Sequence, residues 1–233
     1  MRARQPAIVA VSVLAFACGG QQTPTSATPM PTSPTAPSTA IRFKGEVWAD
    51  NWFSLYLNEA KVAEDSVPIT TERSFNAETF FFNGIYPFEL NFVIKDYIQN
   101  DTGLEYIGTP NQQIGDGGFI MQITDTSTNK VVAISSSAFK CLVIQKAPLN
   151  PGCEKDANPS ATCRSRIDPE PVGWKGAGYD VSGWENATVY TAAQVGPKEG
   201  YTTITWDATA KLIWTSDLKQ DNTLLCKVRV TAP

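Results

Sequence analysis

The sequence predicts an all-β protein built as an antiparallel β-sandwich. Short runs of aromatic and β-branched residues recur along the chain, and several alternate between apolar and polar side chains with the two-residue period of a half-buried strand. Clusters of glycine, asparagine, aspartate and serine separate these runs. No long window has the periodicity of an amphipathic helix, and strands without helices bury their apolar faces by packing two sheets together.

The individual strands follow from the same pattern. In residues 47–57, Phe53, Leu55 and Leu57 alternate with more polar residues, which predicts a strand with one buried face. Further strands are predicted at residues 74–82, 88–95, 118–125, 130–135, 140–145, 202–206, 212–216 and 223–231. The turn residues at 126–129 (TSTN) connect two of these strands and predict a hairpin.

The N-terminus predicts an export signal over residues 1–17. Arg2 and Arg4 precede an apolar run, residues 7–16, that is too short to cross a bilayer as a permanent helix. The sequence LAFAC that ends at Cys18 resembles the lipobox of bacterial lipoproteins, which implies cleavage before this cysteine and a lipid anchor on it. The tripeptide Ala-Phe-Ala within LAFAC also fits an ordinary signal-peptidase site, so simple secretion is the alternative.

Residues 18–40 predict a disordered tether. The segment is rich in threonine, serine and proline and carries no charge, so it cannot bury enough surface to fold. Residues 41–233 are numerous enough for one large domain with a well-buried core. We therefore expect one β-sandwich domain that the tether holds away from a membrane surface.

Charge and composition exclude several classes of function. The formal net charge is −4, and removal of Arg2 and Arg4 with the signal makes the mature form more acidic. This argues against nucleic acid as a partner and for membrane contact only through the lipidated N-terminus. The absence of histidine excludes Ser-His-Asp and Cys-His catalysis and histidine-ligated zinc, and there is no G-x-S-x-G nucleophile motif. We therefore expect a protein that is not an enzyme.

The four cysteines of the domain predict two disulfides, because an exported chain matures in an oxidising compartment. Four cysteines allow three pairings. We favour Cys153 with Cys163, which closes a loop rich in proline, asparagine and serine, and Cys141 with Cys226, which joins two strand-like runs. The first pair would staple an insertion spanning residues 149–176.

Two segments carry a family resemblance. Residues 49–58 (ADNWFSLYLN), followed by Lys61 and Val62, are similar to a strand-and-hairpin motif of galactose-binding-like jelly rolls. Residues 173–184 (GWKGAGYDVSGW) resemble the tryptophan segment of the same family. The segments occur here in reverse order, and Glu59 stands where the family motif has glycine. The resemblance implies a jelly-roll sandwich in permuted or elaborated form, of the kind that accompanies many bacterial glycoside hydrolases.

These segments contain residues suited to sugar recognition, which combines flat aromatic faces with polar edges. The candidate ligand-binding residues are Asp50, Asn51, Trp52, Tyr56, Asn58 and Trp174. The alternative for each tryptophan is core packing, because large aromatic side chains are mostly buried. The alternative for Asp50 and Asn51 is a structural role, in which their side chains satisfy backbone amides where the strand must bend.

A second candidate site lies in the loop before residue 118. Asp96, Asp101, Glu105 and Asp116 stand there among glycines and amides, and carboxylate and carbonyl oxygens are the ligands that Ca²⁺ prefers. The loop lacks the residue spacing of an EF-hand, so a solvated acidic loop is the alternative. A structural calcium ion is the one cofactor that we consider.

These features predict a non-catalytic lipoprotein module of the cell envelope, anchored at the outer membrane or cell surface, or secreted if Cys18 is not lipidated. Its expected partner is a carbohydrate or another extracellular ligand. One alternative is a structural or adhesive lipoprotein that binds other surface proteins. The other is an accessory or degenerate glycoside-hydrolase-type enzyme that uses carboxylates.

Overall fold

The computed structural model describes residues 39–233. The predicted signal peptide, Cys18 and nearly all of the predicted tether therefore lie outside the described residues. Within residues 39–233, no helix has the length and hydropathy that a membrane span requires.

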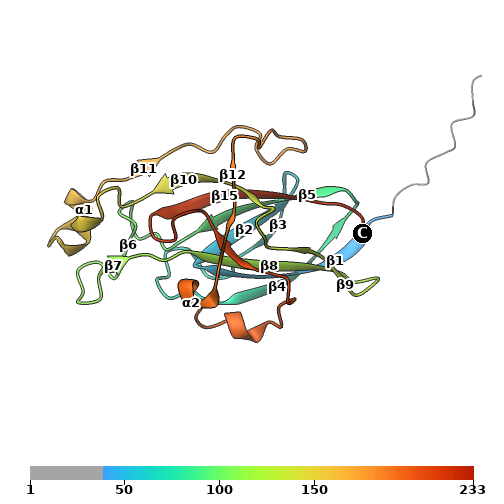
Figure 1. Cartoon of the computed structure of the whole chain (residues 1–233), viewed down its shortest axis with the longest axis horizontal. Coiled ribbons are helices and arrows are strands. Elements are labelled where there is room, and N and C mark those ends of the chain that lie inside the picture. Colours follow the sequence, from blue (N-terminus) through green and yellow to red (C-terminus); the bar gives the residue numbers. More distant parts are fainter. Residues whose placement is uncertain (1–38) are drawn as a thin grey trace, which may run out of the picture. The chain divides into compact units, whose positions relative to one another are not determined.

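Two antiparallel sheets form the two layers of the domain (Figure 1). The first, which we call the β1 sheet, contains β1 (Ile41–Asp50), β4 (Ala77–Gly84), β8 (Gly118–Asp125), β9 (Lys130–Ile134), β13 (Thr188–Tyr190) and β14 (Leu212–Trp214). The strand order is β13-β14-β8-β1-β4, and β9 also pairs with β8. β8 and β9 form the hairpin that the turn residues predicted, in which Asp125 accepts hydrogen bonds from the turn amides of Ser127 and Thr128.

The second sheet, which we call the β5 sheet, has seven strands. They are β2 (Trp52–Leu57), β3 (Ala60–Glu64), β5 (Phe88–Lys95), β10 (Lys140–Lys146), β11 (Arg166–Ile167), β12 (Glu185–Asn186) and β15 (Asp221–Val230). The order is β11-β10-β15-β5-β2-β3, and β12 also pairs with β10. The short strands β6 (Leu104–Glu105) and β7 (Gln113–Ile114) form a separate hairpin. The helices are short: η1 (Pro151–Lys155), α1 (Pro159–Thr162), α2 (Ala192–Val195) and η2 (Tyr201–Thr203).

The core lies between the facing sides of the two sheets. Because side chains alternate along a strand, every second residue points inward, and many of these residues are phenylalanines. Phe119 of the β1 sheet meets Phe92 of the β5 sheet edge to face, with ring centroids 5.1 Å apart. Phe43, Phe53 and Phe139 are also fully buried in this cluster. The sequence prediction of an antiparallel β-sandwich is confirmed.

The chain crosses from one sheet to the other at Asn51. β1 pairs with β4 and β8, whereas β2 pairs with β3 and β5, so the one strand predicted for residues 47–57 is two strands in different layers. The backbone N–H of Asn51 donates to the carbonyl of Lys95, 2.9 Å away, at the end of β5. The crossing brings Asp50 and Asn51 into the interior at one end of the sandwich.

The prediction of a strand at residues 202–206 is wrong. The segment begins with the 3₁₀ turn η2, which follows Gly200 in a positive-φ conformation. Trp206 then folds back, its indole N–H donates to the carbonyl of Tyr201, and the two rings stack with centroids 6.0 Å apart. Local aromatic packing therefore replaces the strand pairing that the β-branched residues suggested.

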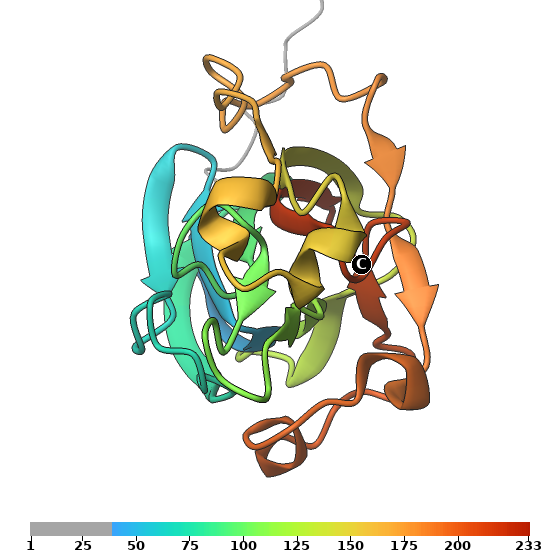
Figure 2. The same cartoon turned by 90° about the vertical axis from the view of Figure 1, so that its left-hand side faces the viewer.

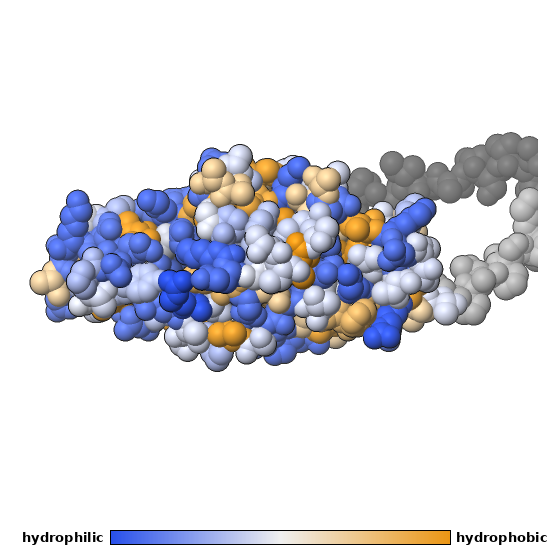
Figure 3. Space-filling model, turned by 90° about the horizontal axis from the view of Figure 1, so that it is seen from below, coloured by the Kyte–Doolittle hydropathy of each residue, from blue (hydrophilic) through white to orange (hydrophobic). Residues whose placement is uncertain are grey.

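Segments without long strands cover the outer face of each sheet (Figure 1). Residues 168–184 lie over the β5 sheet, where Trp174 and Trp184 pack with Val93 and Leu225. The segment around α2 lies over the β1 sheet. From the side shown in Figure 3, apolar residues form small separate patches among polar ones.

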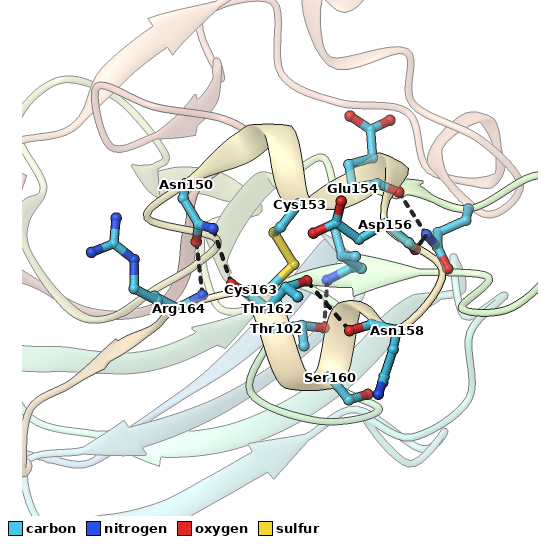
Figure 4. Close-up of a disulfide and its surroundings, with 12 residues drawn as sticks. Thr102, Asn150, Cys153, Glu154, Asp156, Asn158, Ser160, Thr162, Cys163 and Arg164 are labelled. Atoms are coloured by element: carbon cyan, nitrogen blue, oxygen red, sulfur yellow. Dashed lines mark hydrogen bonds between the residues drawn. A yellow bond between two sulfur atoms is a disulfide. The ribbon is translucent and has the colours of Figure 1, made fainter.

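Both predicted disulfides are present. Cys141 and Cys226 are paired neighbours on β10 and β15 and lie in the core. The bond between Cys153 and Cys163 staples η1 to the end of α1 (Figure 4). Beside it, the side chain of Asn150 accepts from the N–H of Arg164 and donates to a carbonyl of the same segment. Two disulfides are typical of a protein that matures in an oxidising, extracytoplasmic compartment.

Candidate functional site

The six candidate ligand-binding residues do not form one site. The crossing at Asn51 separates Asp50 and Asn51, which are fully buried, from Trp52 and Tyr56 on the outer face of β2. Trp174 joins this outer group from the covering segment. Asn58 lies in the turn between β2 and β3 with a φ of 50°, a left-handed conformation that asparagine tolerates better than most residues. The structure thus contains an outer aromatic group and an inner acidic group.

The two tryptophans of the motif at residues 173–184 are packing residues. Trp174 is 2% exposed and Trp184 is 8% exposed, and their ring centroids are 6.0 Å apart on the outer face of the β5 sheet. Ile144 of β10 belongs to the same cluster. The covering segment therefore adds a second, smaller apolar core on the outside of the sandwich.

Lys227 of β15 attaches this covering segment to the sheet. Its ammonium, which is buried, makes an ion pair with Glu89 at 2.5 Å and donates to the side chain of Asn91 at 2.9 Å. It also donates to the backbone carbonyls of Trp174 at 3.3 Å and Gly176 at 3.0 Å. A buried ammonium with this many acceptors has replaced the water that it loses on folding.

The part of the outer aromatic group that reaches the surface has lysines beside it. Lys95 lies 5.4 Å from the ring centroid of Trp52, and Lys175 lies 4.2 Å from that of Tyr56. Both rings are half-buried. A depression of about 360 Å³ lies beside Lys175 and is lined by Glu59, Glu170 and residues 171–175.

Glu170 is the acceptor in this depression. It accepts from the indole N–H of Trp174 at 2.8 Å and from Lys175 at 3.2 Å. Burial favours a raised pKa for Glu170, but these two hydrogen bonds outweigh it and hold the pKa below its ordinary value. Glu170 is therefore a carboxylate at neutral pH, in contact with Trp174 and Lys175 and under the electrostatic influence of Lys95.

The acidic group lies at the end of the sandwich seen in Figure 2, which carries the β6–β7 hairpin and α1. Asp50 ends β1, Asp96 directly follows β5, Glu105 belongs to β6, and Asp116 follows β7. Lys198 reaches the same place from the loop after α2. We call these five residues the acidic cluster.

Lys198 lies between two of the carboxylates. Its Nζ is 3.6 Å from Oδ2 of Asp50 and 3.6 Å from Oδ1 of Asp116, and 4.3 Å from the ring centroid of Phe75. Burial would lower the pKa of Lys198, but Asp50, Asp116 and Glu105 outweigh this and raise it. The lysine of the cluster is therefore charged at neutral pH.

Asp96 and Glu105 complete the cluster. Asp96 Oδ1 accepts from the N–H of Tyr97 at 2.7 Å, and Glu105 Oε2 accepts from the side chain of Gln113 at 2.8 Å. Burial raises the pKa of Asp50 and Asp96 well above the ordinary aspartate value and also raises that of Glu105. Neighbouring carboxylates add to the effect at Asp96, since Asp50 and Glu105 repel its charge.

The structure changes the calcium prediction in two ways. It brings Asp96, Glu105 and Asp116 together, as the sequence suggested, and adds Asp50 from a distant strand. It leaves out Asp101, which is exposed and lies beside Asn100 along a separate depression of about 280 Å³. Within residues 39–233, no three acidic or cysteine side chains already converge as a formed metal site.

Lys198 is the cluster residue that sequence reasoning missed. It stands in a loop between Gly196 and Gly200, and no motif or periodicity connects it with the acidic residues. Asp96 carried a usable signal, because it directly follows the strand predicted at residues 88–95 and therefore lies at an end of the sheet, where other strands also end. The sequence could not show which other strand ends meet there.

The chain matches no family model, and comparisons with the curated proteins and with the solved structures likewise gave no match.

Proposed function

We propose that the protein is an exported, non-catalytic binding module that takes a carbohydrate on the outer face of β2. The observation that supports this most directly is the grouping of two partly exposed rings, Trp52 and Tyr56, with Lys95, Lys175 and Glu170 beside a surface depression. Sugar rings present apolar faces and polar edges, and this surface combines aromatic rings with two ammonium donors and a carboxylate acceptor.

The positions of the two rings fit this use. Trp52 and Tyr56 lie on the same side of β2, four residues apart, so the strand spaces them by roughly 13 Å along its axis. Ser54 lies between them on that side and is 2% exposed, so the two rings reach the surface as separate contact points for a ligand.

The proposal includes export and anchoring. Removal of the signal peptide and acylation of Cys18 would hold the domain at the outer membrane or cell surface on an uncharged tether. The two disulfides of the domain support an extracytoplasmic location. Mass spectrometry of the mature N-terminus from a bacterial host tests the anchor: an acylated Cys18 is expected, and an unmodified Cys18 would refute it.

Glycan-array screening of the mature protein, followed by calorimetry with the best ligand, tests the binding site. Trp52→Ala should weaken binding about tenfold or more, since one stacked ring contributes on the order of 1–2 kcal/mol. Trp206→Ala is the matched control, because Trp206 is also half-buried but lies over the β1 sheet. Equal losses in both variants, or no glycan bound by the wild type, would favour the structural or adhesive alternative.

A further inference from the structure

The acidic cluster has a large excess of carboxyl groups over basic groups for a buried site. It contains four carboxylates, three of them almost without exposed surface, and one ammonium. Charged groups removed from water require compensating charge or hydrogen bonds, and removal of one partner from a buried pair is strongly destabilising. Lys198 alone cannot supply this compensation, because its side chain is 31% exposed and both of its carboxylate distances exceed hydrogen-bond length.

A second observation is that oxygen atoms in and beside the cluster lack donors. Both carboxylate oxygens of Asp50 and the amide oxygens of Asn51 and Asn222 accept no hydrogen bond from any residue in 39–233. Asn51 is 0% exposed and Asn222 is 1% exposed. Buried polar atoms are normally satisfied, so four unpaired oxygens in one region indicate a missing positive partner.

Asn222 contacts the acidic cluster directly, and Asn51 is the chain neighbour of Asp50. Asn222 Nδ2 lies 3.5 Å from Oδ2 of Asp96, and the backbone N–H of Asp96 donates to the carbonyl of Asn222 at 2.9 Å. Asn51 follows Asp50 directly and is held in the interior because its side-chain nitrogen donates to the carbonyl of Ser74. The four unpaired oxygens thus come from two places in the chain, the end of β1 with the residue that follows it and the start of β15.

The chemistry of these groups selects a class of ligand. Every unpaired atom is an oxygen, and carboxylate and amide oxygens are the ligands of hard divalent cations. Ca²⁺ accepts 6–8 oxygens in irregular arrangements, whereas Mg²⁺ requires near-octahedral geometry and keeps its water. A set of carboxylates and amides from several loops and strand ends therefore suits Ca²⁺.

We propose that the acidic cluster is a calcium site in which Lys198 occupies the position of the ion when calcium is absent. Asp50, Asp96, Glu105 and Asp116 supply the carboxylates. When Ca²⁺ enters, the ammonium of Lys198 leaves and the carboxylates close around the ion. This explains why no three acidic side chains within residues 39–233 already converge on one point: the ammonium of Lys198 lies between the carboxylates of Asp50 and Asp116.

The surroundings of Lys198 allow this exchange. Its loop follows α2, which ends at Gly196 in the left-handed conformation, and Gly200 also has positive φ. Its partly exposed side chain has open solvent to move into. Asp116 also lines a surface depression of about 290 Å³, so the cluster reaches the surface at this residue.

Terbium luminescence and thermal unfolding of the full mature protein test the proposal. Tb³⁺ should bind and be sensitised by nearby tryptophans, and Ca²⁺ should displace it while equal Mg²⁺ does not. Lys198→Met should bind Ca²⁺ about tenfold more tightly than the wild type, because a competing charge is gone. Asp50→Asn should bind about tenfold more weakly or worse, because a ligand charge is lost.

Asp101→Asn is the matched control, since Asp101 is an exposed acid of the same loop outside the cluster. Its calcium affinity should equal that of the wild type. Thermal unfolding distinguishes loss of the calcium site from loss of the fold. Without calcium, the unfolding midpoint of Lys198→Met should be lower than that of the wild type. Saturating Ca²⁺ should raise the midpoint of the variant by more degrees than that of the wild type. Failure of both proteins to bind Ca²⁺, or equal losses in the Asp50 and Asp101 variants, would overturn the proposal.

Discussion

The ammonium of Lys198 lies 3.6 Å from a carboxylate oxygen of Asp50, a side chain with no exposed surface. The two residues come from opposite ends of the chain, one at the end of β1 and the other in the loop after α2. Their contact brings the last third of the chain onto the end of the sandwich where the chain crosses from β1 in one sheet to β2 in the other. The stability of this end therefore depends on how its carboxylates are compensated.

The acidic cluster should make stability depend on pH. In the folded protein, burial raises the pKa of Asp50 and Asp96 above the unfolded value, so the folded state holds their protons more tightly. Stability is therefore higher at acidic pH and falls as the pH rises from the unfolded pKa, about 4, through the raised pKa values. Urea unfolding in EDTA between pH 4 and 8 measures this.

The matched variant for this prediction is Asp96→Asn, which removes one titrating group and keeps its shape. Its stability should decline less than that of the wild type as the pH rises. Equal pH dependence of the two proteins would show that the carboxyl of Asp96 does not hold its proton in the fold.

Gly115 should be intolerant of a side chain. A Cβ atom at this position would lie 2.1 Å from Oδ2 of Asp96, whereas a Cβ at Gly152 would have no neighbour within 4 Å. Gly115→Ala must therefore displace the loop of Asp116 or the carboxylate of Asp96, at a cost of about 1–3 kcal/mol. Gly152→Ala should change the free energy of unfolding by about 0.5 kcal/mol or less. Chemical denaturation of both variants compares the two costs.

Lys227 should contribute more to the stability of the fold than Arg229, the other cation of β15 that pairs with Glu89. Lys227 is buried and contacts Glu89 at 2.5 Å, whereas Arg229 is exposed and lies 3.7 Å from the same carboxylate. Lys227→Met leaves Glu89 buried without its close partner and should cost about 3–5 kcal/mol. Arg229→Met should cost less than about 1 kcal/mol. Similar losses in the two variants would show that Lys227 is not the main attachment of the covering segment.

The two disulfides should differ in their effect on stability. The bond between Cys141 and Cys226 links residues 85 apart, whereas the bond between Cys153 and Cys163 links residues 10 apart. Because loop-closure entropy grows with loop length, removal of the first by paired alanine substitutions should cost about 4–5 kcal/mol and removal of the second about 3 kcal/mol. Thermal unfolding of the two double variants gives the order, and the reverse order would contradict this explanation.

Several features of the fold could be predicted because their signals are local. The strands at residues 88–95 and 118–125 have the bounds that the pattern of apolar residues gave. The hairpin after β8 followed from its turn residues, and Asn129 does adopt the positive φ expected there. Both favoured cysteine pairs are present: Cys141 and Cys226 lie in two runs predicted as strands, and Cys153 and Cys163 lie in one loop rich in proline, asparagine and serine.

The candidate sites were predicted less completely. Of the predicted aromatic residues, Trp52 and Tyr56 are partly exposed, but Trp174 is a packing residue, because a covering segment buries its aromatic rings against the sheet. A sequence pattern shows which side chains can stack on a ligand, but their exposure depends on what else packs there.

The sequence by itself determined the class of fold and the acidic character of the loop before β8, because periodicity, turn chemistry and composition act over short stretches of chain; it favoured one of three cysteine pairings, which the structure contains. Only the tertiary structure decided that Asp50 and Asn51 lie in the interior, apart from Trp52 and Tyr56, that Asp101 stays outside, and that Lys198 joins the acidic cluster. These outcomes depend on where separate strand ends meet, and that is set by the packing of the two sheets.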